Sequence, residues 1–171
     1  MKYLFLDFDG VLHPDEVYRN PKTGLVYLDQ QLVDVGHQLF EHAELLAALL
    51  DRSGVDVSIV LSTSWVKVLR RFNVVKRRLP ERLQSRVVGA TWHSSMSRGG
   101  NGIFESMTRC QQILSYCTRH DIYSHEWIAI DDDDVGWRSD CRGNLVHTDK
   151  TFGLGKIESQ QELMEKLIGR K

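Results

Sequence analysis

Two carboxylates end the first apolar run of the chain. Tyr3–Leu6 is followed directly by Asp7, and Asp9 comes one residue later. An apolar run that ends in acid is typical of a buried strand that presents a site at its carboxyl end. Alternate residues of an extended chain point to the same side, so Asp7 and Asp9 would lie close together and repel each other. Mg2+, which prefers oxygen ligands, would relieve that repulsion. The following Gly10 allows a tight turn.

A second apolar run ends in the same way much later in the chain. Trp127–Ile130 leads into four successive acids, which begin with Asp131 and Asp132. Four neighbouring carboxylates repel one another, and a divalent cation would remove the conflict. The alternative is an acidic surface loop. If both apolar runs are parallel strands of one sheet, their acids meet at the same edge.

A run of hydroxyl side chains follows a third apolar segment. Val55–Leu61 is rich in β-branched residues and predicts a strand, and Ser62, Thr63 and Ser64 come directly after it. A hydroxyl at this point could donate to a phosphate oxygen. The alternative is that these side chains cap the next helix, which is the role we expect for Ser64.

Three segments together resemble a known family. Leu6–Pro14, Leu61–Trp65 and Trp127–Asp132 are similar to motifs of the haloacid dehalogenase (HAD) superfamily, and more narrowly to the HAD domains of Swiss Army Knife RNA-repair proteins. The resemblance spans nearly the whole chain. It implies that Asp7 is a nucleophile that forms an aspartyl-phosphate and that Asp9 acts as general acid and base.

The resemblance also implies the remaining parts of the site. Mg2+ would be held by Asp7, by Asp9 through its backbone carbonyl, and by Asp131 or Asp132, of which one binds directly. Ser62 is expected to contact the phosphoryl group, with Thr63 as the competing choice. The role of the basic residue that offsets the charge of the phosphoryl group is assigned to Arg109, with Arg98 and Lys150 as alternatives.

These assignments predict a Mg2+-dependent phosphatase that acts on a phosphorylated substrate, which could be a nucleic-acid or nucleotide end. An acid at position 9 favours phosphate chemistry, since members without it tend towards dehalogenation. The alternative is a non-catalytic domain that binds phosphate, Mg2+ or nucleic acid in a regulatory role. A phospho-accepting receiver domain fits less well, because its acceptor aspartate follows a middle strand.

The elements that must position these residues alternate between strand and helix patterns. This order predicts an α/β/α three-layer sandwich with a mainly parallel, Rossmannoid HAD-like sheet. The resemblance implies that the region from His13 to Leu28 is a hairpin flap beside the active site, and this region is too short for a separate cap domain. Further strands are expected at Leu25–Leu28, Arg86–Thr91 and Leu145–His147. Helices are expected at Gln38–Asp51, with Gly54 beyond its end, at Trp65–Leu83, at Phe104–His120, and from a capping box at Ser159 to Ile168.

Composition is that of an ordinary globular protein. The chain has 171 residues, is 42% hydrophobic and carries a formal net charge of -1, which suits one domain over residues 1–171. We expect a cytoplasmic protein with no membrane span and reduced cysteines. The segment 67–86 is strongly basic and could bind nucleic acid, or be a solvated helix face. Residues 92–102 predict a loop rich in Ser and Gly.

Overall fold

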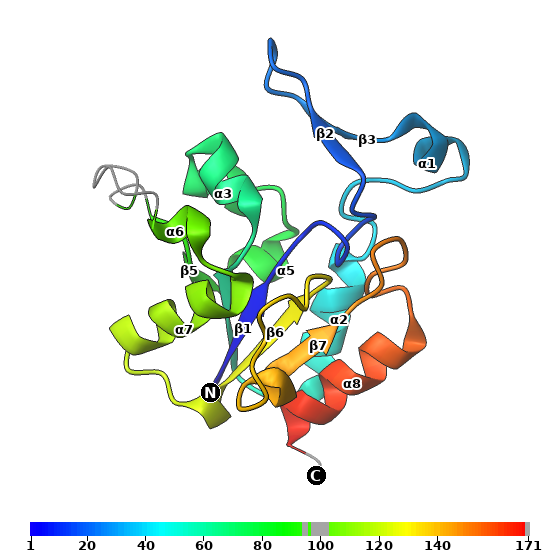
Figure 1. The fold of residues 1–171 in the computed structure, drawn as a ribbon. Coiled ribbons are helices and arrows are strands. Elements are labelled where there is room, and N and C mark those ends of the chain that lie inside the picture. Colours follow the sequence, from blue (N-terminus) through cyan, green and yellow to red (C-terminus); the bar gives the residue numbers. More distant parts are fainter. Residues whose placement is uncertain (94–95, 97–102, 170–171) are drawn as a thin grey trace.

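The computed structural model describes residues 1–93, 96 and 103–169, so Arg98 and most of the predicted 92–102 loop lie outside the described residues. A five-stranded parallel sheet with the order β5-β4-β1-β6-β7 runs through the centre of the molecule (Figure 1). This confirms the predicted α/β class and the mainly parallel sheet. The strands are β1 (Lys2–Leu6), β4 (Val57–Leu61), β5 (Val87–Ala90), β6 (Trp127–Asp131) and β7 (Leu145–His147).

Alternate residues of the central strands bury their side chains on opposite faces of the sheet. In β1, Leu4 and Leu6 belong to the core beneath α2 (Ala43–Ser53) and α8 (Ile157–Ile168), whereas Phe5 belongs to the core beneath α7 (Arg109–Arg119). Both faces are therefore covered, which explains why the strands are almost continuously apolar. Figure 1 shows the resulting three layers, with α7 on one side of the sheet and α2 and α8 on the other.

A hairpin rises above the carboxyl ends of the sheet strands (Figure 1). It consists of β2 (Val17–Arg19) and β3 (Val26–Leu28), which pair antiparallel, and is followed by the short helix α1 (Gln30–Asp34). This hairpin is the flap expected from the sequence, with one strand more than the pattern predicted. Within the described part of the chain no separate cap domain is present.

The prediction of a single helix over Trp65–Leu83 is wrong. The structure has three short helices instead, α3 (Ser64–Leu69), α4 (Phe72–Lys76) and α5 (Glu81–Gln84). The first ends because Arg70 adopts a left-handed backbone conformation with φ of 51°. Pro80 stands directly before the third, where its missing N–H costs no helical hydrogen bond. The basic residues of this segment therefore do not form one continuous helical face.

Other helix ends also differ from the predicted ones. The helix expected from Gln38 begins only at Ala43, after Phe40 has taken a left-handed φ of 63°. Its end at Gly54 is confirmed, with φ of 66° in the left-handed region that glycine adopts easily. The capping box expected at Ser159 is wrong, because α8 begins two residues earlier and Ser159 is buried in its first turn.

The helix predicted over Phe104–His120 is divided into α6 (Ile103–Ser106) and α7. Cys110 and Cys117 lie on α7 against the sheet, and with Cys141 they are free and buried. The described residues also include the 3-10 turns η2 (Ser124–Glu126) and η3 (Arg142–Asn144). None of the helices in the described residues has the length and apolar character needed to cross a bilayer.

Candidate active site

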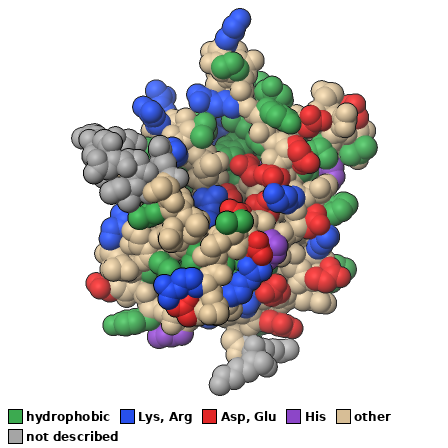
Figure 2. All heavy atoms as spheres, viewed as in Figure 1, with side chains coloured by type: hydrophobic (Ala, Val, Ile, Leu, Met, Phe, Trp, Pro, Cys, Tyr) green, Lys and Arg blue, Asp and Glu red, His purple; other side chains and the backbone are tan. Residues whose placement is uncertain are grey.

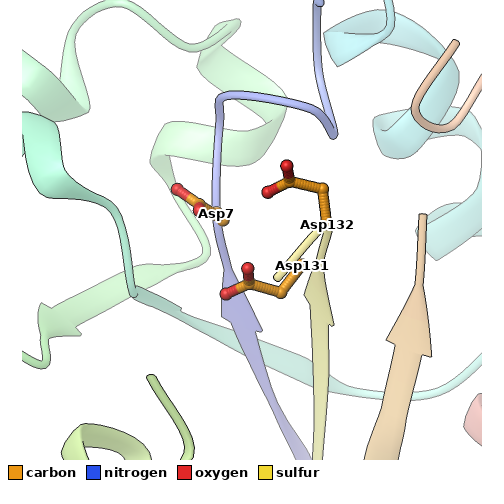
Figure 3. Close-up of side chains that lie close together, drawn as sticks. All are labelled: Asp7, Asp131 and Asp132. Carbon is orange, nitrogen blue, oxygen red and sulfur yellow. The ribbon is translucent and has the colours of Figure 1, made fainter. Parts of the chain in front are cut away.

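Three carboxylates meet at the carboxyl ends of two neighbouring strands. Asp7 follows β1 directly, Asp131 is the last residue of β6 and Asp132 comes next. Since β1 and β6 are adjacent and parallel, with Leu6 opposite Ile130, their ends bring the acids together. One oxygen from each carboxylate lies within 4.8 Å of the others, and Figure 3 shows the three side chains around a common space. The side chains of these acids are almost completely buried.

Burial makes the negative charges of these acids costly. It raises the pKa of Asp7 and raises that of Asp131 well above its ordinary value, while the positive charge of Arg109 opposes both shifts. Burial, with the charge of Asp7 next in importance, raises the pKa of Asp132 to about 6. Such groups are neutral or paired unless a cation compensates them. The donor set, three carboxylates and no sulfur or imidazole, is the type that Mg2+ prefers.

Arg109 bridges two of these acids. Its Nη2 donates to Oδ2 of Asp7 at 2.9 Å, and its Nε lies 2.9 Å from Oδ2 of Asp131. The second contact is an ion pair without hydrogen-bond alignment, so Oδ2 of Asp131 is buried with no hydrogen-bond donor. Burial lowers the pKa of Arg109, but the charges of Asp7 and Asp131 outweigh this and raise it. One cation offsets one of three carboxylates, and the remaining charge fits a divalent metal.

A capping box places Arg109 at this point. Thr108 is the N-cap of α7, where its Oγ1 accepts from the backbone N–H of Gln111 and its own N–H donates to Oε1 of Gln111. Arg109 is therefore the first residue of the helix. The Thr-x-x-Gln spacing is a signal that the sequence interpretation missed. Lys150, by contrast, has a largely exposed side chain and pairs with Asp15 at 3.9 Å.

The carboxylate of Asp9 lies outside the cluster of three acids and is held by two other side chains. Its Oδ1 accepts from Nε1 of Trp65 at 2.7 Å and lies 3.1 Å from Nε2 of His13. Nδ1 of the buried His13 accepts from the backbone N–H of Phe40, which leaves the ring proton on Nε2 and makes His13 a donor to Asp9. Neither Trp65 nor His13 was identified from the sequence as a partner of Asp9.

Gly10 is required where it stands. Its φ is 65°, and a Cβ at this position would lie 2.5 Å from Cγ of Asp132. The carbonyl of Gly10 accepts from Oγ1 of Thr148 at 2.8 Å, which ties the turn after β1 to the segment after β7. Glycine is therefore needed at position 10 for two reasons. It allows the turn predicted from the sequence, and it leaves room for the side chain of Asp132.

Comparison with known proteins agrees with this arrangement. The family model for the HAD domain in Swiss Army Knife RNA repair proteins matches residues 3–158. The chain belongs to this HAD family. Searches of curated proteins and of solved structures gave no match. The resemblance inferred from the sequence is thereby confirmed, and the buried group of three acids is consistent with the active site of a HAD domain.

The hydroxyl residues of this HAD domain differ in their surroundings. Thr63, and not Ser64 as predicted, caps α3, since its Oγ1 accepts from the backbone N–H of Trp65 at 3.3 Å. Thr63 also lines a pocket of about 250 Å³ together with Arg109 and Lys67. Ser62 is buried, and its Oγ has no hydrogen-bond partner among the described residues. The structure thus places Thr63 at the pocket that Arg109 lines.

In the described part of the HAD domain, two hollows are lined by residues of the candidate site. The first is the pocket lined by Thr63 and Arg109. The second is a groove of about 120 Å³ between the hairpin and α3, and Asp9 is one of the residues that line it. Figure 2 shows acidic side chains gathered near the middle of this face, with Lys and Arg side chains around them.

The basic segment of the HAD domain is partly used inside the fold. Arg82 and Arg86 both pair with Asp51, and Nζ of Lys76 donates to the carbonyl of Val87. Lys67 lines the pocket beside Arg109. The helix break therefore separates this segment into residues with structural contacts, one residue at the pocket, and exposed side chains such as Arg70.

Proposed function

We propose that this HAD domain is a Mg2+-dependent phosphomonoesterase that works through an aspartyl-phosphate on Asp7. The observation that supports it best is the buried group of Asp7, Asp131 and Asp132, with Arg109 in contact with two of them. This group combines anionic metal ligands with a fixed cation, as phosphoryl transfer requires. Membership of the family supports Asp7 as the nucleophile.

Asp7, Asp131 and Asp132 would hold the metal, together with the backbone carbonyl of Asp9. Bound Mg2+ would reduce repulsion between the nucleophile and the phosphate and stabilise charge on the transferring oxygens. The buried Oδ2 of Asp131, which accepts no hydrogen bond, is suited to a cation.

In the proposed reaction, a carboxylate oxygen of Asp7 attacks phosphorus as the bond to the leaving oxygen breaks. Asp9 gives its proton to that oxygen. Thr63 donates to an oxygen of the phosphoryl group, and Arg109 offsets its charge. In the second half, Asp9 takes a proton from water, the water oxygen attacks phosphorus, and Asp7 is released with inorganic phosphate. Ser62, the first choice from the sequence, is replaced in this proposal by Thr63, which lines the pocket.

We further propose that the physiological substrate is a phosphorylated nucleic-acid or nucleotide end. The family of RNA repair proteins supports this substrate class. The absence of a cap domain in the described residues would leave the site accessible to a polymer end. Exposed basic side chains of the 67–86 segment, such as Arg70 and Arg71, would attract its phosphates.

The test is hydrolysis of a generic aryl phosphate by the wild type, Asp7→Asn and Asp134→Asn, each with Mg2+ and with a chelator. Asp134 is the matched control, because it belongs to the same acidic run but pairs with Arg142 at the surface. We expect Mg2+-dependent turnover by the wild type and Asp134→Asn and none by Asp7→Asn. An acid-quenched reaction should carry one phosphoryl group on the Asp7 peptide.

Mg2+ binding without turnover of aryl, RNA or DNA phosphates would contradict the proposed phosphatase activity and favour a non-catalytic binding domain. Turnover that persists in Asp7→Asn would remove Asp7 as nucleophile. Comparison of 5′- and 3′-phosphorylated RNA and DNA would then identify the end that is processed.

A further inference from the structure

The groove between the hairpin and α3 is lined in part by Asp9, the proposed proton donor. It is about 120 Å³ in volume, and its lining includes Asp9 together with Val26, Trp65 and Val68. A group that receives a proton from Asp9 leaves from this position. The groove is thus the space next to the leaving oxygen, whereas Thr63 and Arg109 line the separate pocket on the phosphoryl side.

Hairpin register decides which flap side chains face the groove. Val17 and Arg19 are two residues apart in β2 and point to the same side, and Val26 pairs directly with Arg19. Val26 is buried in the core, so this side of the hairpin faces the protein. Tyr18 is also part of the groove lining, but its side chain alternates with those of Val17 and Arg19 and pairs with the exposed Tyr27. Arg19 is therefore the charged flap side chain on the groove side.

The guanidinium of Arg19 lies at the outer end of the hairpin. Its Nη2 would be 3.6 Å from a Cβ placed on Gly24, in the turn between β2 and β3. Within the described part of the chain Arg19 has no acidic partner, in contrast to Arg82, Arg86 and Arg109. The lining of the groove thus includes the proposed proton donor, several apolar side chains, and Arg19, an exposed cation without an acidic partner in the described part of the chain.

We propose that this groove binds the leaving group and that Arg19 contacts a second phosphate on it. The matching occupant is a nucleoside unit, whose sugar and base lie against Trp65 and Val68 and whose next phosphate reaches Arg19. Preferred substrates are then phosphate esters with another phosphate one nucleoside away, at a nucleic-acid end or in a nucleoside bisphosphate. This inference rests on the proposed phosphatase function. Arginine suits the contact because its planar fork binds phosphate with two donors.

The experiment compares kcat/KM for uridine 3′-monophosphate, uridine 5′-monophosphate, uridine 3′,5′-bisphosphate and an end-phosphorylated dinucleotide. We expect the wild type to favour the substrates with a second phosphate about tenfold or more, mainly through KM. Arg19→Ala should remove this preference, and Arg19→Lys should restore part of it. The monophosphates should be hydrolysed equally well by all variants, which would show that fold and chemistry are intact.

Lys22→Ala is the matched control. Lys22 is an exposed cation in the same hairpin turn but does not line the groove. Its removal changes the net charge by the same amount and should alter the preference less than twofold. Activity on the dinucleotide but not on the bisphosphate would assign the site to nucleic-acid ends, and equal activity would assign it to the shared second phosphate.

The inference is overturned if Arg19→Ala lowers kcat/KM equally for mono- and bisphosphates, or if Lys22→Ala has the same effect as Arg19→Ala. If the wild type turns over no phosphate ester, the phosphatase proposal itself has failed. Binding of uridine 3′,5′-bisphosphate, measured by calorimetry, then tests the groove proposal independently of turnover. Weaker binding by Arg19→Ala than by Lys22→Ala supports the contact, and equal binding rejects it.

Discussion

Arg109 and Asp7 are 102 positions apart in the chain, yet Nη2 of Arg109 donates to Oδ2 of Asp7 at 2.9 Å. The contact positions a cation beside the proposed nucleophile before any substrate arrives. Because the same guanidinium also approaches Asp131, its removal would leave the buried acids without their cation. Arg109 thus connects the proposed nucleophile with the acids that are proposed to bind the metal.

Replacement of Arg109 tests this role. We expect Arg109→Ala to lower kcat on an aryl phosphate about 100-fold, because a fixed donor to the phosphoryl oxygens is lost. Arg109→Lys should recover part of the lost kcat, since lysine keeps the positive charge but lacks the planar guanidinium with its paired donors. Steady-state kinetics measures both, with Arg138→Ala as control, because Arg138 pairs with Asp140 at the surface. Unchanged kcat in Arg109→Ala would exclude it from the reaction.

Gly10→Ala should weaken Mg2+ binding more than it destabilises the fold. The new Cβ would meet Cγ of Asp132 at 2.5 Å and displace this proposed metal ligand. Gly54→Ala is the control, because Gly54 has nearly the same φ but no atom within 4 Å of the added Cβ. Both substitutions carry about 1 kcal/mol of backbone strain. Calorimetric titration with Mg2+ should show weaker affinity for Gly10→Ala alone, and equal affinities would contradict the argument.

Removal of the indole donor to Asp9 should slow catalysis without much loss of stability. Trp65→Phe keeps an aromatic ring near Phe8 and Phe40 but deletes the Nε1 hydrogen bond to Asp9. We expect kcat to fall about tenfold, because Asp9 is oriented less well, and stability to fall by about 1 kcal/mol. Trp137→Phe, which deletes an indole bond to the carbonyl of Asp133, is the control. Equal kcat in both variants would remove Trp65 from the site.

Mg2+ should stabilise the protein against heat. A divalent ion offsets the repulsion of the buried acids, and at 100 times Kd it contributes about 2.7 kcal/mol, which corresponds to several degrees in Tm. Asp131→Asn should abolish this rise, whereas Asp134→Asn should keep it, because its side chain lies at the surface. Thermal unfolding with Mg2+ and with chelator measures the effect. A rise of equal size in Asp131→Asn would place the ion elsewhere.

The charged carboxylate of Asp149 should stabilise the protein near neutral pH and lose this effect in acid. Hydrogen bonds from Nζ of Lys156 and from the backbone N–H groups of Phe152 and Thr151 lower the pKa of Asp149 from its ordinary value of 3.8 to about 2. A carboxyl with a depressed folded pKa contributes stability above its unfolded pKa and loses it as pH falls towards the folded value.

Asp149→Asn should therefore be less stable than the wild type at pH 6, by about 1 kcal/mol after allowance for solvent screening. The difference should shrink between pH 4 and pH 2. Urea unfolding at several pH values measures it, with the exposed Asp140→Asn as control. A difference that stays constant down to pH 2 would show that the effect does not come from the charge of Asp149.

The sequence alone determined the sheet and the acids at its edge. Apolar runs that stop at Asp7 and at Asp131 are local signals, because burial and charge change within one or two residues. A parallel arrangement then brings the two strand ends together without further information. The motifs around these acids also indicated the family, and the match over residues 3–158 confirms it.

Tertiary structure alone decided how the other side chains of the site are held. Arg109 reaches the acids because the predicted helix breaks before Thr108, and helical periodicity does not show such a break. The hydrogen bond from Trp65 to Asp9 joins residues 56 positions apart, and the close approach of Asp132 to Gly10 spans most of the chain. Periodicity reports which face of an element is buried, but individual contacts depend on how faces from distant segments pack, and only the folded chain specifies that packing.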